Sequence, residues 1–529
     1  MSQHIIQSGD RIYTESNETR VPSNAFDLSH DSRFSGNMGT LYPATWFEVL
    51  PGDRISVDPE SLVRFQPMVA PPMQRINCRS YAFFVPLRLL WKNWEKFISP
   101  PSTDTVTPAV PFFAQVGSVS PRSLAAMLGV PSGVDLNDRF SALPFAAYQK
   151  IWYDWFRDQN IYPNNQFIEL YDGNNDTGGG IGFAGWNTLF NVSQDRDYFT
   201  SATPWAQKGP SVVIPAITGT ANVVLKPGPQ VGRFRTDSGD PMPTGTQPMN
   251  VIPFGGGSNY GTPAIPTSQL VYDPNSSLGV DVSTSSSGTM IELARAEMLQ
   301  VFLAKDAIGG TRYIETIETH FGVRSSDERL QRPEYLGSTN QAIAISEVLN
   351  TAGGDQPQGT MAGHGISSTN DRYRDYYAEE HGIYMVLCDV KPTTAYYQGL
   401  HRSFLRFDRF DYAWPEFANI GMQAILNKEV YYNNDGLNND VFGYIQRYGE
   451  YRTLPNRIAG EFRTSLEFWH LGRKFTSRPV LSSNFTNVQP DDNLRIFAVT
   501  DPAVDHVLFH WMFRVKAWRK LPRIPEDQF

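Results

Sequence analysis

The most prominent cluster of chemically active side chains lies near the C-terminus, where five cations occur in a stretch without any acid. Arg514, Lys516, Arg519, Lys520 and Arg523 follow one another there, and Trp511 and Trp518 are interleaved with them. Guanidinium and ammonium groups neutralise phosphate, and an indole ring stacks on an unpaired base. We therefore predict a nucleic-acid contact made by Arg514, Lys516, Trp518, Arg519, Lys520 and Arg523. The alternative is that these cations form ion pairs with acids elsewhere in the chain.

Other residue patterns that could do chemistry point to no catalytic or metal site. His506 and His510 are four residues apart, which suits metal chelation on a helix, but on a strand they lie about 13 Å apart. The adjacent carboxylates Glu379 and Glu380 face opposite ways in a strand. The glycine runs at 178–180 and 255–257 lack the lysine of a phosphate-binding loop, and no HExxH or GxSxG motif occurs. We expect no metal, no cofactor and no enzymatic activity.

The composition is typical of a folded protein that hides much of its surface in contacts. Of 529 residues, 40% are hydrophobic and 13% aromatic, while only 19% are charged, fewer than the usual figure of about 25%. The net charge of −9 excludes a uniformly basic coat for nucleic acid, so such a contact must be local. Two cysteines, Cys78 and Cys388, are too few for a disulfide framework, which favours cytoplasmic folding with reduced thiols.

The N-terminal segment 1–40 is polar and has no apolar periodicity. We expect it to be an extended arm that reaches a neighbouring subunit, with disorder as the alternative. It lacks the pattern of a cleaved signal, and no apolar run in the chain approaches the ~18 residues that cross a bilayer. A soluble protein without a cleaved export signal is therefore expected.

Hydrophobic periodicity predicts many short strands and few helices. Alternation predicts strands at 45–50, 54–57, 76–85, 381–390 and 507–516. Helical spacing occurs at 87–98, 145–155 and 289–310, and the last of these begins with a capping box of Thr289 and Glu292 and ends at Gly309-Gly310. Its predicted apolar face includes Ile291 and Met298. The pattern indicates a mainly β protein, an antiparallel sandwich with long loop insertions.

Two segments rich in glycine are expected to be loops. Residues 211–288 contain 10 prolines and 11 glycines among 78 residues, more than a quarter of the segment, which disfavours regular structure. The second segment covers 351–370. Long insertions of this kind are usually functional surfaces.

A set of short segments carries a resemblance to a known family. The two most specific are RDYFTS at 196–201 and RLQRPEYLG at 329–337. Others are LPGD at 50–53, FFVPLRLLW at 83–91, PWAQKG at 204–209, GGTRY at 309–313, HFGV at 320–323, WPEF at 414–417, FGY at 442–444 and EYR at 450–452. In this order they resemble the major capsid protein of the Microviridae, in its gokushovirus-like branch. The resemblance runs from about residue 20 to the C-terminus and is weakest over 211–288, where the family itself varies.

The resemblance implies an eight-stranded jelly roll and a T=1 icosahedral shell of 60 copies around a circular single-stranded DNA genome. Assembly would take place in the host cytoplasm and the product would be the virion. The capsid domain would cover 41–529, with 211–288 as a protrusion at the threefold axes. A small basic packaging protein would share the interior. Aromatic residues of the protrusion, Phe234, Phe254, Tyr260 and Tyr272, are then candidates for contact with a host-cell receptor, which could be a glycan.

A jelly-roll carbohydrate-binding protein or glycosidase is the alternative from another class, because aromatic-rich loops suit sugar rings. A glycosidase needs two carboxylates facing each other across a cleft, and no sequence pattern points to such a pair. Particle formation distinguishes the two, since a capsid protein forms uniform particles and a lectin stays small.

Overall fold

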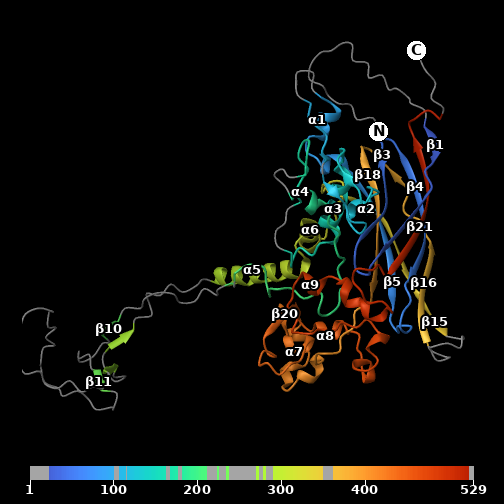
Figure 1. Cartoon of the computed structure of the whole chain (residues 1–529). Coiled ribbons are helices and arrows are strands. Elements are labelled where there is room, and N and C mark those ends of the chain that lie inside the picture. Colours follow the sequence, from blue (N-terminus) through green and yellow to red (C-terminus); the bar gives the residue numbers. More distant parts are fainter. Residues whose placement is uncertain are drawn as a thin grey trace, which may run out of the picture. The chain divides into compact units, whose positions relative to one another are not determined.

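The structure is a computed structural model of the chain (Figure 1). It describes residues 23–100, 107–114, 116–162, 167–176, 181–210, 212, 223–225, 234–236, 270–272, 278–280, 290–349 and 361–523. The chain divides into two compact units, one made of Met1–Lys208 with Ala304–Phe529, the other of Gly209–Leu303. No helix among the described residues is long and apolar enough to span a membrane.

The first unit is built on two antiparallel sheets. The larger has seven strands in the order β1-β21-β4-β16-β15, with β2 beside β21 and β17 beside β4. Its strands are β1 (Asn24–Asp27), β2 (His30–Gly36), β4 (Arg54–Phe65), β15 (Ala344–Leu349), β16 (Met361–Asn370), β17 (Tyr376–Tyr377) and β21 (Val507–Arg519). The smaller sheet has the order β14-β5-β18-β3, made of β3 (Tyr42–Val49), β5 (Ile76–Pro86), β14 (Glu334–Ala342) and β18 (Gly382–Pro392).

The two sheets pack face to face over the main hydrophobic core (Figure 1). Alternate residues of the long strands β21, β4, β5 and β18 enter it, such as Phe509 and Trp511 from β21 and Cys78 and Tyr384 from the smaller sheet. Both cysteines are buried free thiols, as the strand pattern around Cys78 predicts. A mainly β, antiparallel fold with few helices is confirmed. The sheets hold seven and four strands, and the eight-stranded jelly roll remains a prediction.

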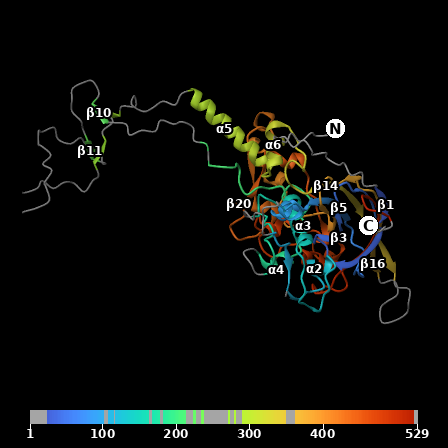
Figure 2. The same cartoon turned by 90° about the horizontal axis from the view of Figure 1, so that it is seen from above.

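A second core covers the outer face of the smaller sheet. It is formed by α2 (Leu124–Met127), α3 (Leu143–Ile151), the π-helical turn η2 (Trp152–Phe156) and α4 (Gly182–Trp186). Phe83 and Met385 of the sheet pack against this layer, which Figure 2 shows beside β3 and β5. A sheet buried on both faces needs apolar residues at consecutive positions, and every residue of β18 is accordingly buried.

The remaining elements of this unit are short. They are η1 (Leu87–Leu89), α1 (Trp94–Ile98), β6 (Phe112–Phe113), β7 (Gly117–Ser118), β8 (Asp135–Leu136), β9 (Phe140–Ser141), α6 (Tyr313–Phe321), η4 (Arg402–Leu405), η5 (Arg409–Asp411), η6 (Pro415–Phe417), β19 (Met422–Leu426), α7 (Asn427–Val430), β20 (Val441–Gln446), α8 (Gly449–Arg452), η7 (Gly460–Arg463), η8 (Glu467–Trp469), α9 (Ser483–Thr486) and η9 (Pro490–Ile496). A third core lies around β19 and β20.

Within the insertion the structure describes two pairs of short strands. They are β10 (Val223–Leu225) with β13 (Leu278–Val280), and β11 (Phe234–Thr236) with β12 (Leu270–Tyr272). The helix α5 (Met290–Gly309) follows, and it starts and stops where the sequence predicts. The apolar side chains Ile291 and Met298, expected to pack on one face, are exposed.

The prediction of one helix over 87–98 was wrong. The segment forms η1 and α1, separated by residues 90–93. The indole of Trp91 is fully buried in the second core and donates a hydrogen bond to Asp172 (2.6 Å), and Asn93 binds the same carboxylate. Burial of Trp91 and these bonds hold the chain in a bend that a continuous helix could not follow.

The prediction of a loop over 351–370 was wrong for residues 361–370, which form β16 between β4 and β15. Glycine suits this strand because its neighbours lie very close. A side chain at Gly363 would come within 2.8 Å of the Ala70 carbonyl oxygen, and one at Gly365 would meet the ring of Phe65. Residues 351–360 lie outside the described part.

The segment expected to be an N-terminal arm is divided by the structure. Residues 24–36 form β1 and β2, both paired with β21 of the same chain. This part belongs to the sandwich because Leu28 and Phe34 pack against its core. Residues 1–22 lie outside the described part, and an arm there remains a prediction.

Candidate functional site

The predicted nucleic-acid strip follows β21, and the strand divides its residues between two environments. Arg514, Lys516, Trp518 and Lys520 are exposed, while Arg519 is mostly buried. Arg523 is exposed just beyond the strand. Trp511 lies on the opposite face, fully buried in the sandwich core. It therefore cannot stack on a base, and Trp518 is the indole of the strip that can.

Two arginines of the strip are engaged within the subunit. Arg519 forms an ion pair with Asp53 at 3.0 Å and donates to the Glu48 carbonyl oxygen at 2.7 Å. Asp53 is fully buried in the turn between β3 and β4, where its carboxylate also accepts the Leu50 N–H. Arg514 pairs with Glu60 on the adjacent strand at 2.8 Å. The alternative of internal ion pairs therefore holds for Arg514 and Arg519.

Three cations of the strip are left without such partners. Lys516, Lys520 and Arg523 form no ion pair within 4.0 Å among the residues that the structure describes. Lys516 stands opposite Asp27 across β1 and β21, and the Lys516 charge contributes to lowering the pKa of Asp27, after two hydrogen bonds from Ser29. The exposed positive charge of the strip is thus smaller than the sequence suggests and gathers toward the end of β21.

Acids and bases alternate over the rest of this outer sheet face. Arg372 lies between Asp58 (3.5 Å) and Asp375 (2.9 Å), and Arg54 also reaches Asp375 (3.7 Å). Exposed pairs of this kind contribute little stability. They leave the face close to neutral apart from the end of β21.

The candidate host-attachment residues fall in the insertion and are only partly described. Phe234 on β11 and Tyr272 on β12 are direct partners in the strand register. Phe254 and Tyr260 lie outside the described residues. The pairing brings together two of the four candidates that the sequence separates by 38 positions.

His506 and His510 bind different partners. The His506 ring is buried and hydrogen-bonds Asn37 and the Val499 carbonyl oxygen, each at 2.8 Å. His510 pairs with Asp31 at 3.2 Å on the outer face. Within the described ranges no three or more His, Cys, Asp or Glu side chains gather in a way that could hold a metal ion.

An exposed group of aromatic side chains lies on the segment 404–414, here called the aromatic surface, and was not predicted from the sequence. Its members are Phe404, Phe407, Phe410, Tyr412 and Trp414, and all are exposed, Phe407 to 88%. Exposed contiguous apolar patches mark sites of protein association. The available signal was the density of aromatic residues in this segment, which follows neither a helical nor a strand period.

The aromatic surface stands on a rigid polar frame. Arg402 pairs with the buried Glu429 at 2.9 Å, and Arg406 pairs with the buried Glu450 at 3.2 Å. Burial raises the pKa of Glu429, although Arg402 opposes the shift. Trp414 is fixed as well, since its indole donates to the Arg409 carbonyl oxygen at 2.8 Å. These contacts hold the rings in place without covering them, which is the arrangement of a preformed docking surface.

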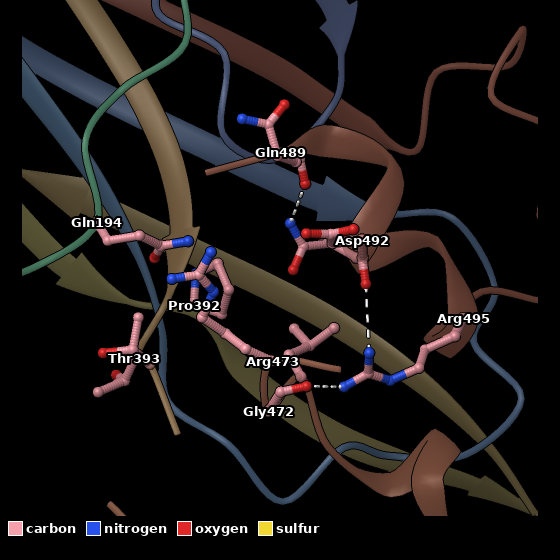
Figure 3. A pocket seen from close by; sticks show the side chains of 11 residues that line it. Gln194, Pro392, Thr393, Gly472, Arg473, Gln489, Asp492 and Arg495 are labelled. Atoms are coloured by element: carbon pink, nitrogen blue, oxygen red, sulfur yellow. Dashed lines mark hydrogen bonds between the residues drawn. The ribbon is translucent and has the colours of Figure 1, made fainter. Parts of the chain in front are cut away.

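Two cavities of the described part are polar, and neither has paired carboxylates. The first, at Gln194, Arg473 and Arg495, measures about 10 Å³, enough for one water molecule at most (Figure 3). In it Arg495 donates to the carbonyl oxygens of Asp492 and Gly472. The second measures about 180 Å³ and is lined by several cations and a single acid, Asp158. The two facing carboxylates of a glycosidase occur in neither cavity.

Comparisons with known proteins give one family match and three similar proteins, and all of them are capsid proteins. Residues 15–527 match the family model described as Capsid protein (F protein). Capsid protein VP1 of Bdellovibrio phage phiMH2K is 36% identical over 480 residues, covering 86% of this chain and 87% of that protein. Capsid protein VP1 of Chlamydia phage 1 is 31% identical, covering 89% and 90%, and Capsid protein VP1 of Spiroplasma virus 4 is 30% identical, covering 88% and 87%.

Proposed function

Because the chain belongs to the phage capsid protein (F protein) family, we propose that 60 copies of it assemble into a T=1 icosahedral shell around a circular single-stranded DNA genome. The resemblance to the Microviridae capsid protein is confirmed, and as a capsid protein the chain is a component of the virion. Its role in the shell is structural, without catalysis of its own, and assembly takes place in the host cytoplasm.

The two sheets supply the scaffold for this role. The larger sheet has seven strands and the smaller four. For an eight-stranded jelly roll, β21, β4, β16 and β15, which are consecutive neighbours in the larger sheet, are proposed as the partners of the four strands of the smaller sheet. Closed icosahedral symmetry uses the same surfaces on every subunit, so a rigid subunit with fixed docking surfaces is required.

The observation that carries the shell proposal is the aromatic surface. Five large rings are exposed on a segment that buried ion pairs hold fixed. Aromatic residues anchor protein interfaces, and burial stabilises association by about 25 cal/mol per Å² before entropic costs. A second copy of the chain is the partner that a shell provides for this surface.

The C-terminal strip is proposed to face the genome. Lys516, Lys520 and Arg523 offer charge that no described acid pairs with, and Trp518 offers a partly exposed indole. Neutralisation of phosphate and stacking on unpaired bases both suit single-stranded DNA. The net charge of −9 leaves most of the genome charge to other cations, which supports the small basic packaging protein as a further partner.

The insertion 211–288 is proposed to form the threefold protrusions and to contact a host-cell receptor. The experiment compares the wild-type chain with a variant in which a short glycine-serine linker replaces 211–288. Electron micrographs of both are expected to show uniform particles of one size. Adsorption to host cells is expected only for the wild type. Small soluble species from the wild type would reject the shell, and full adsorption of the deletion variant would reject the receptor role.

A further inference from the structure

The 180 Å³ cavity lies on the side of the smaller sheet away from the C-terminal strip, and four cations line it. They come from four separate parts of the chain: Arg157 after η2, Arg196, Arg312 at the start of α6, and Lys391 of β18. The only acid in its lining is Asp158. Tyr81, Trp155 and Phe156 add aromatic walls. Cations from four chain segments around one space of this size make a site suited to an anion.

Three of the four cations have internal partners that fix their positions. Arg196 pairs with Asp158 at 3.2 Å, and Arg312 pairs with Glu315 at 3.2 Å. Lys391 pairs with Asp195 at 3.0 Å, and Arg79 of β5 binds the same carboxylate. Burial alone would raise the pKa of Asp195, but Arg79 and Lys391 hold this pKa below its usual value. These ion pairs fix the orientation of the cations that line the cavity and neutralise part of their charge.

Arg157 is the exception. The residue is 6% exposed, it forms no ion pair among the described residues, and its Nε has no hydrogen-bond partner there. Its guanidinium lies over the Tyr153 ring at 4.1 Å, and Arg312 donates to its carbonyl oxygen at 2.7 Å. Burial lowers the pKa of Arg157 and the charge of Arg312 adds to the shift, whereas Tyr153, Asp154 and Asp158 oppose it. Because none of the described acids lies within ion-pair distance, the buried charge is only partly compensated, which is costly, and a bound anion would stabilise it.

Two segments that carry the family resemblance meet at this cavity. Arg196 begins the RDYFTS segment and Arg312 belongs to GGTRY, and the shell proposal uses neither. Among the described residues the Nε–H of Arg312, like that of Arg157, has no hydrogen-bond partner, so unused donors come from two chain segments at the cavity. The buried Oε1 of Gln194 is an unused acceptor and would face a water molecule or a ligand hydroxyl rather than the anion itself.

We propose that this cavity binds a phosphate group, supplied either as free phosphate or as one phosphodiester of a nucleic-acid strand. A carboxylate is satisfied by a single guanidinium fork, whereas a phosphate group has enough oxygen atoms for several arginines and a lysine. The cavity has room for several water molecules and therefore for a hydrated oxyanion. This site is separate from the C-terminal strip, so it goes beyond the function proposed above.

The test uses the full-length protein and variants Arg157→Gln and Arg157→Lys, with Arg64→Gln on the larger sheet as a matched loss of one charge. Thermal unfolding is measured in chloride and in inorganic phosphate at equal pH and ionic strength. Phosphate is expected to raise the Tm of the wild type and Arg64→Gln by a few degrees. In Arg157→Gln the half-saturating phosphate concentration rises at least about tenfold; Arg157→Lys retains part of the effect.

A second arm identifies the source of the phosphate. If the ligand is a phosphodiester, inorganic phosphate competes with a labelled oligodeoxythymidylate, and Arg157→Gln weakens oligonucleotide binding. If it is free phosphate, oligonucleotide binding is the same in wild type and variant while the Tm effect is lost. Equal phosphate stabilisation of wild type and Arg157→Gln, or none in the wild type, overturns the proposal. If Arg157→Gln does not fold, Arg196→Gln at the half-exposed rim is read in the same way. Particle formation by the wild type is scored separately, so failure here leaves the shell proposal standing.

Discussion

At the scale of single residues, Asp389 of β18 shows how burial sets a pH response. Its side chain is fully buried beside Lys391, and burial raises its pKa to about 6 although Lys391 and Arg79 pull the other way. Between about pH 4 and pH 6 the folded protein keeps a proton that the unfolded chain releases. The contribution of this residue to stability is therefore full below the unfolded pKa of 3.8 and is lost as the pH rises through 6.

The variant Asp389→Asn removes this titration. A difference of about 2 pKa units corresponds to about 3 kcal/mol, so the free energy of unfolding of the variant, relative to wild type, is expected to increase by up to that amount from about pH 4 to about pH 8. Denaturant unfolding at a series of pH values measures it. The exposed Asp435, whose pKa Arg478 lowers, serves as control. Because this group titrates below the window, the difference in free energy of unfolding between Asp435→Asn and wild type is expected to stay nearly constant from about pH 4 to about pH 8. Parallel pH profiles for wild type and Asp389→Asn would contradict the assignment.

At the scale of elements, β21 combines a core face with the face that is proposed to contact the genome. The double variant Lys516→Gln, Lys520→Gln removes two exposed charges that form no ion pair in the part of the chain that the structure describes. The affinity of the full-length protein for single-stranded DNA is expected to fall, and the slope of log affinity against log salt to decrease by about 0.7 for each lost contact. Fluorescence anisotropy with a labelled oligonucleotide over a salt series measures both. An unchanged slope would remove the strip from the genome surface.

Arg519→Gln is the informative comparison within the same strip. It leaves the buried carboxylate of Asp53 without its cation, which costs about 3–5 kcal/mol in comparable cases. We expect this variant mainly to lose folding stability, because Arg519 holds the turn between β3 and β4 to β21. The two variants together separate the structural cation from those available to DNA.

The same element explains what the sequence could predict. β21 alternates strictly because one face is buried and the other is not, and β18 is continuously apolar because both of its faces are buried. Such hydrophobic patterns lie within single strands and can be recognised in the sequence. The bend at Trp91 depends on Asp172, 81 positions away, and the strand at Gly363 depends on close contact with Ala70 and Pro71. The cavity around Arg157 unites residues from 81 to 391, and no linear pattern records that convergence.

At the scale of the whole molecule, exposed and buried surfaces are distributed as an assembling subunit requires. The charged outer face of the larger sheet alternates acids and bases, which suits contact with water or with polar partners. The aromatic surface differs because Phe404 and Phe407 are exposed although the buried Glu429 and Glu450 hold their segment rigid. A monomer gains nothing from ordering such rings in water, whereas a subunit contact in the proposed shell would remove them from solvent.

The substitution Phe407→Asp tests whether this surface makes subunit contacts. A carboxylate at the most exposed ring position leaves the subunit core untouched, because Phe407 is 88% exposed. It would place a charge in the contact between copies, where an unpaired buried charge is strongly unfavourable. Light scattering and electron microscopy are expected to show the loss of particles, while circular dichroism and the Tm of the free subunit stay close to wild type. Phe407→Leu, which keeps an apolar side chain, is expected to assemble. Normal particles from Phe407→Asp would place the aromatic surface outside the subunit contacts and leave its exposed rings to another partner.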